Sequence, residues 1–116
     1  VLIDAFNKVR NHFGMSRIAQ AGALAALADQ EYLEQTQTQT AACRAVLSEL
    51  AADHGFKPIP SATNFVTMDC GRDGPFAKAI LDALIARNIF IRMPGVPPLN
   101  RCIRTSCGPA DAIAMR

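Results

Sequence analysis

The chain has 116 residues, half of them apolar, and its net charge of +2 comes from basic and acidic residues that are interspersed. This length allows one domain with a hydrophobic core, and we expect a single small domain over residues 1–116. No apolar run approaches the roughly 18 residues that cross a membrane, and the mixed charge gives no basic footprint for nucleic acid. Composition therefore predicts a cytoplasmic protein that binds neither membranes nor nucleic acid.

The first predicted element is a helix that begins at the start of the chain, with no capping residue before it. Its apolar side chains recur at helical spacing, at Leu2, Phe6, Val9 and Phe13. At the other end, a helix over Ala110–Arg116 stops after about two turns, which is too short to be stable without packing. Both ends look cut, so we expect a piece of a larger polypeptide.

Two further helices are predicted in the first half. Gly14 ends the first helix, and Ser16 can cap a second over about Arg17–Ala28. A third helix, over about Gln30–His54, ends at Gly55, which is a good C-cap residue. Its predicted buried face comprises Leu33, Cys43, Val46, Leu47 and Leu50. Its EQTQTQT stretch is interpreted as a solvated helix surface.

The second half predicts strands around one helix. Residues 64–70, NFVTMDC, favour a strand, and Asp73 can cap a helix over Gly74–Arg87 that ends at a left-handed Asn88. Two strands follow on either side of a proline-rich loop, over Ile89–Arg92 and Arg101–Ser106. The predicted fold class is α+β, with a small sheet of about three strands and helices packed on one face.

The last two predicted strands each carry one arginine, Arg92 and Arg104. If their faces adjoin, both guanidinium groups point the same way and suit a small carboxylate or phosphate. The alternative is structural: Arg104 pairs with Asp69 or Asp111, and Arg92 reaches solvent.

The residues that could catalyse a reaction lack partners. Ser61, Ser106 and the cysteines have no associated histidine and carboxylate, and the lysines Lys8, Lys57 and Lys78 lie in surface contexts. The four cysteines form no CxxC and have no histidine at zinc spacing, so they are interpreted as reduced core thiols: Cys43, Cys70, Cys102 and Cys107. We expect no catalytic, cofactor-binding or metal-binding residue in this chain.

Three segments together resemble one family: KVRNHFGMSRIAQAGALAAL (8–27), PSATNFVTMDCG (60–71) and IFIRMPGVPPLNRCIRTSCGP (89–109). They are similar to the C-terminal small domain of class I and II pyridoxal-phosphate-dependent aminotransferases, and most similar to the histidinol-phosphate aminotransferase branch. The similarity spans nearly the whole chain in the correct order.

This resemblance implies roles for three residues. Arg104 matches the arginine that binds the carboxylate end of the substrate, and Arg92 matches a second substrate-proximal arginine. Asn64 matches an asparagine whose amide could hold the Arg104 guanidinium in place. It also implies a parent enzyme that uses pyridoxal 5'-phosphate to transfer an amino group between an amino acid, or a histidinol-phosphate-like amine, and a 2-oxo acid.

The resemblance further implies that the cofactor and its lysine belong to a large domain absent here, and that the complete enzyme is a homodimer. The chain alone is then expected to bind no cofactor and to be inactive. The alternative from another class is a stand-alone amino-acid-binding or regulatory α+β module that uses the same arginines without catalysis.

Overall fold

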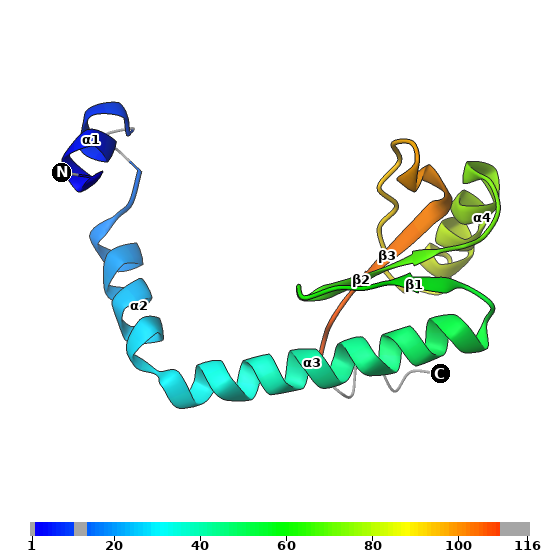
Figure 1. Cartoon of the computed structure of the whole chain (residues 1–116), viewed down its shortest axis with the longest axis horizontal. Helices are drawn as coiled ribbons and strands as arrows, with labels where there is room; N and C mark the ends of the chain where they lie inside the picture. Colours follow the sequence, from blue (N-terminus) through cyan, green and yellow to red (C-terminus); the bar gives the residue numbers. More distant parts are fainter. Residues whose placement is uncertain (1, 11–13, 110–116) are drawn as a thin grey trace. The chain divides into compact units, whose positions relative to one another are not determined.

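The computed structural model describes residues 2–10 and 14–109 (Figure 1). Contacts divide the chain into a first unit over Val1–Gln35 and a second over Thr36–Arg116. The elements in chain order are α1 Leu2–Val9, α2 Arg17–Ala28, α3 Gln30–Asp53, β1 Lys57–Ile59, β2 Phe65–Asp69, α4 Gly74–Ile85, the short 3-10 helix η1 Leu99–Arg101, and β3 Cys102–Ser106. The predicted helix over Ala110–Arg116 lies outside the described residues. No helix within them is long and apolar enough to cross a membrane.

The first unit is helical, as predicted. The Ser16 hydroxyl accepts a hydrogen bond from the Ala19 N–H at 3.1 Å, so Ser16 caps α2 as the sequence indicates. Neither α1 nor α2 has a buried side chain among the described residues. Phe13, which belongs to the predicted first helix, lies outside them.

The second unit contains a three-stranded antiparallel sheet in the order β1-β2-β3. In the β2–β3 register, Val66 pairs with Thr105 and Met68 pairs with Ile103. Because side chains alternate along a strand, these residues share one face of the sheet, and Phe65, Thr67 and Arg104 share the other. The α+β architecture predicted from the sequence is confirmed.

Helices α3 and α4 cover the first of these two faces. The buried core cluster comprises Cys43, Leu47 and Ala51 of α3, Ala77 of α4, and Val66, Met68, Cys70 and Ile103. The α3 members follow one another at spacings of four residues, which places them on a single helical stripe. We call the sheet face under α3 and α4 the core face, and the opposite face, with Phe65 and Arg104, the open face.

The predicted buried face of α3 is partly wrong. Leu33, Val46 and Leu50 are 41–43% exposed, whereas Ala51 is buried. Cys43 and Leu47 are buried as predicted. The buried stripe is narrower than the apolar pattern because, among the described residues, the second-unit part of α3 packs on the sheet along one side only.

Helix α4 begins at Gly74 as the sequence indicates, and it ends at Ile85, two residues before the predicted Arg87. The Asp73 carboxylate accepts from the Phe76 N–H at 3.0 Å, which caps its start. At its end, the N–H groups of Asn88 and Ile89 donate to the carbonyls of Ile85 and Leu84, both at 2.9 Å. Asn88 has φ +61°, so these bonds form a Schellman motif around a left-handed residue.

The prediction of a strand over Ile89–Arg92 is wrong, because only Arg92 pairs, as an isolated bridge to Arg104. Beyond Arg92, the next N–H position facing β3 would be Pro94, which has none. The third strand is instead β1, which pairs with β2 and which the sequence analysis did not assign as a strand. Pro58 interrupts its pattern and is tolerated because β1 is an edge strand.

Candidate functional site

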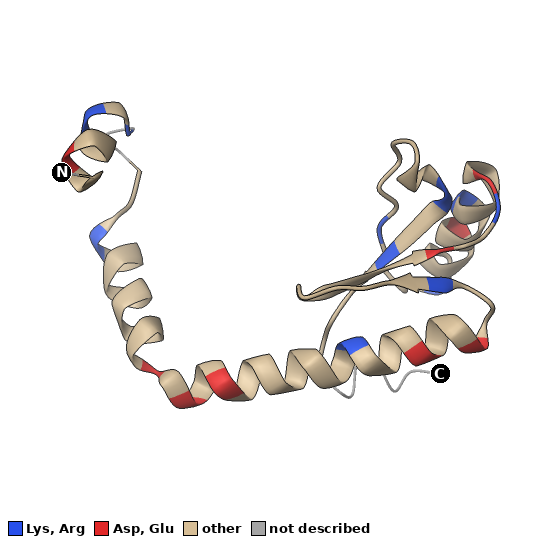
Figure 2. Cartoon of the chain, viewed as in Figure 1, with Lys and Arg blue, Asp and Glu red and all other residues tan. Residues whose placement is uncertain are grey.

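The Arg92–Arg104 bridge brings the two predicted arginines directly opposite each other. The Arg92 N–H donates to the Arg104 carbonyl at 2.9 Å, and the Arg104 N–H donates back at 2.6 Å. In an antiparallel pair, residues that exchange both bonds carry their side chains on the same face. Figure 2 shows basic positions on β3 and on the segment beside it. The condition that the two strand faces adjoin is therefore met, on the open face.

No carboxylate neutralises this pair within residues 2–10 and 14–109. Arg92 is exposed and Arg104 is half-buried, and neither guanidinium has an ion pair with any described residue. Like charges directly opposite each other destabilise a sheet. A bound anion would relieve that repulsion and could accept bidentate hydrogen bonds from the guanidinium N–H groups.

Asp69, the first structural partner considered for Arg104, is bound elsewhere. Its carboxylate accepts from Arg101 at 2.5 Å and from the Gly71 N–H at 2.9 Å. The Gly71 hydrogen bond, followed by the bond and positive charge of Arg101, lowers the pKa of Asp69 below its ordinary value. The structural alternative therefore fails for Asp69, while Asp111 lies outside the described residues.

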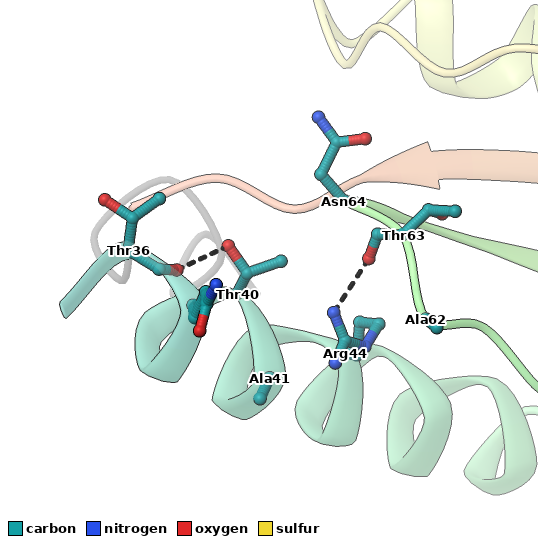
Figure 3. A pocket seen from close by; sticks show the side chains of 8 residues that line it. Thr36, Thr40, Ala41, Arg44, Ala62, Thr63 and Asn64 are labelled. Carbon is teal, nitrogen blue, oxygen red and sulfur yellow. Dashed lines mark hydrogen bonds between the residues drawn. The ribbon is translucent and has the colours of Figure 1, made fainter. Parts of the chain in front are cut away.

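Arg104 contacts an aromatic ring. Its guanidinium carbon lies 4.6 Å from the centre of the Phe65 ring. This contact was missed from the sequence, although Phe65 directly follows the predicted site residue Asn64. Asn64 is exposed, and its carbonyl accepts from the Cys107 N–H at 2.8 Å. Figure 3 shows its side chain pointing away from α3.

A separate pocket of about 490 Å³ lies between α3 and the loop before β2. It is lined by Thr36, Gln37, Thr40, Ala41, Arg44, Ala62, Thr63 and Asn64. Arg44 donates to the Thr63 carbonyl at 2.8 Å, which fastens the loop to the helix (Figure 3). The sequence pattern does not indicate Arg44, and it predicts a solvated surface for the neighbouring EQTQTQT stretch of α3. Of the predicted site residues, only Asn64 lines this pocket.

Cys43, Cys70 and Cys102 are buried and Cys107 is half-buried, and all four are free thiols. Desolvation raises the pKa of Cys70 and Cys102. Desolvation, together with the neighbouring Cys43 thiol, raises the pKa of Cys107 to about 11. A thiol with a raised pKa is a poor nucleophile at neutral pH. In the part of the chain that the structure describes, no cluster of three or more histidine, cysteine or acidic residues could hold a metal ion.

The fold and the arginine pair define a small α+β domain whose open face carries Arg92 and Arg104 opposite each other. The chain matches the family model for aminotransferase class I and II over residues 1–114, and it therefore belongs to that family. It is similar to the crystal structure of histidinol-phosphate aminotransferase from Sinorhizobium meliloti in complex with pyridoxal-5'-phosphate. Sequence identity is 56% and the TM-score is 0.86, over 94% of this chain and 30% of that chain.

Curated relatives of the chain are also named histidinol-phosphate aminotransferase. Histidinol-phosphate aminotransferase 2 of Methylococcus capsulatus is 36% identical over 112 residues, which are 97% of this chain and 29% of the relative. The histidinol-phosphate aminotransferase of Geobacter sp. strain M21 is 38% identical over 92% of this chain and 30% of its own length. The chain thus spans about three tenths of the relatives it matches.

The described residues do not fit covalent attachment of pyridoxal phosphate. That attachment needs a lysine in a desolvated pocket, where its amine loses its charge readily. Lys8, Lys57 and Lys78 are all exposed, and Lys78 is paired with Asp82 at 2.8 Å. None of the three lysines therefore offers such a pocket.

Proposed function

We propose that this chain is the substrate-binding small domain of a pyridoxal-phosphate-dependent aminotransferase. The observation that carries the proposal is the bridge that sets Arg92 and Arg104 opposite each other on the open face. Membership of the aminotransferase class I and II family supports the reaction class. The transfer of an amino group between an amine and a 2-oxo acid follows from that class.

In this proposal Arg104 binds the anionic end of the substrate and Arg92 assists it. A guanidinium group offers a planar fork of donors that matches a carboxylate or phosphate, and a strand holds that fork in a fixed direction. Fixing one end of the substrate orients the reacting end, which converts binding energy into correct positioning. Asn64, beside Phe65, is proposed as a third substrate-proximal residue.

The cofactor, its lysine and a second subunit are proposed to come from outside these 116 residues. Pyridoxal phosphate supplies the electron-withdrawing chemistry in such enzymes, and the similar structure from Sinorhizobium meliloti contains it. We expect the chain by itself to be inactive, because its three lysines are exposed. Three further points stay predictions: the amino donor, which is an amino acid or a histidinol-phosphate-like amine, the homodimer, and the cytoplasmic location.

The test is the Arg104→Ala variant of the full-length protein from its native gene, assayed for transamination. We expect kcat/KM to fall about a hundredfold or more, because a misplaced substrate reacts poorly, while the cofactor's absorbance is retained. Arg101→Ala is the matched control: Arg101 lies next to the same strand, but its guanidinium is bound to Asp69. Near-normal turnover by Arg104→Ala would overturn the assignment.

A second assay separates this proposal from a stand-alone sensor. The 116-residue chain is titrated with amino acids by calorimetry. A half-site without cofactor should show no saturable binding, whereas saturable micromolar binding would favour the amino-acid-binding module.

A further inference from the structure

Arg104 is held from one side by an aromatic ring. The 4.6 Å between its guanidinium carbon and the Phe65 ring centre lies within the roughly 6 Å range of a cation–π interaction. Both side chains are half-buried, so the contact is only partly screened by solvent. Such a contact restricts where the guanidinium can lie.

The strand register places Phe65 and Arg104 within reach of each other. Phe65 pairs with Ser106 and Thr67 pairs with Arg104, so Phe65 is the diagonal neighbour of Arg104 on the open face. Diagonal neighbours are within reach of aromatic and long side chains. The same two strands that place Arg104 therefore also place the ring.

Other described residues provide no competing support for this guanidinium. Within residues 2–10 and 14–109, the Arg104 side chain makes no hydrogen bond and no ion pair, and the Asn64 amide does not bond to it. A ring contact needs no acceptor atom, so it leaves the guanidinium N–H groups available for a substrate anion.

We propose that Phe65 is a positioning residue that orients Arg104 toward the substrate anion. This inference rests on the proposed function, because it assigns to Phe65 the support of the proposed substrate-binding arginine. The aromatic ring is the required feature: tyrosine can replace it, whereas leucine fills similar space without a π face.

The chain offers a matched control for loss of a ring. The Arg72 guanidinium lies 4.3 Å from the Phe76 ring, and Phe76 packs against the core cluster on the other face of the sheet. Phe76→Leu therefore removes a comparable contact and comparable packing, away from the arginine pair.

The experiment uses the full-length protein loaded with cofactor. Wild type is first screened with the twenty common amino acids and histidinol phosphate as donors and 2-oxoglutarate as acceptor. KM and kcat for the best donor are then measured for Phe65→Leu, Phe65→Tyr, Phe76→Leu and Arg104→Ala. We expect Phe65→Leu to raise KM about two- to fivefold with little change in kcat, as for loss of one partly exposed cation–π contact. Phe65→Tyr should restore the wild-type KM, and Phe76→Leu should leave KM unchanged even if it lowers thermal stability.

The outcomes distinguish the two proposals. If Arg104→Ala loses activity while Phe65→Leu keeps the wild-type KM, the proposed function stands and the role of Phe65 is overturned. A tyrosine variant that behaves like leucine, or a Phe76→Leu variant with the same rise in KM, also overturns it. If no donor reacts, or if Arg104→Ala is fully active, the proposed function fails and the inference fails with it.

Discussion

The two faces of the β2–β3 ladder are built from alternate residues of the same strands, yet most of their residues differ in burial and polarity. On the core face, Val66, Met68 and Ile103 are at most 5% exposed and pack under α3 and α4. On the open face, Phe65, Thr67 and Arg104 are half-buried, and the residues Arg92 and Arg104 are paired across the bridge. The core face stabilises the fold, whereas the open face carries the two arginines that we propose bind an anion.

The largest expected effect is on the core face. Ile103→Ala should lower the free energy of unfolding by about 2–5 kcal/mol, because it removes buried methyl groups and leaves a cavity. Urea denaturation of the chain measures this loss. The matched control is Thr67→Ala. Thr67 belongs to the next pair of the same ladder but lies on the open face, so this change should lower the free energy of unfolding far less. Equal losses would show that the two faces do not differ as described.

A smaller effect is expected at the start of α4, which covers the core face. Asp73→Ala removes the cap on the Phe76 N–H and should cost about 1 kcal/mol of unfolding free energy. Asp73→Asn keeps a side-chain acceptor and should lose little. If the alanine and asparagine variants unfold at the same urea concentration, the cap does not contribute.

On the open face, removing a charge should stabilise the chain. Arg92→Gln relieves the repulsion with Arg104 and should raise the free energy of unfolding by about 0.2–1 kcal/mol. Arg92→Lys keeps the charge and should not. The gain should shrink at about 1 M salt, where charges are screened within a few ångströms. A destabilised Arg92→Gln protein would argue against a site that sacrifices stability for anion binding.

The sequence predicted helix ends well because each depends on one local residue. Ser16 and Asp73 place an acceptor at a helix start, and Asn88 adopts the left-handed conformation at a helix end. These preferences act over three or four residues, so no knowledge of distant packing is needed. Their positions in the structure agree with the prediction.

The strands were harder to predict because pairing joins distant residues. The apolar run at Ile89 to Arg92 favours a strand, but it forms one bridge, at Arg92, and Pro94 offers no N–H to extend the pairing. The segment Lys57–Ile59 contains a proline, yet it pairs with β2 along an edge. In the candidate site, alternation along each strand indicated that Arg92 and Arg104 point the same way if their faces adjoin. The pairing that brings them together and the Phe65 contact depend on strand register, which a single sequence does not specify.

The smallest expected effect concerns Asp69 on the open face, and it appears only in acid. The folded-state pKa of Asp69 lies below its ordinary 3.8, because the Gly71 N–H and Arg101 favour the carboxylate. The stability that this provides is complete above the unfolded pKa and is lost as the pH falls through the folded pKa. The stability advantage of wild type over Asp69→Asn should therefore be constant from about pH 5 upward and shrink between about pH 4 and pH 2.

Arg101→Gln sharpens the measurement, since it leaves the Gly71 bond and removes the positive charge. In that variant the acid loss should begin at a higher pH than in wild type, because the folded pKa of Asp69 moves back toward its ordinary value. Thermal unfolding followed by circular dichroism across this pH range gives both curves. Parallel curves for wild type and Asp69→Asn would mean that neither the Gly71 bond nor the Arg101 pair lowers the pKa of Asp69 in solution. Arg101 would then be as free as Arg92 and Arg104 to attract an anion.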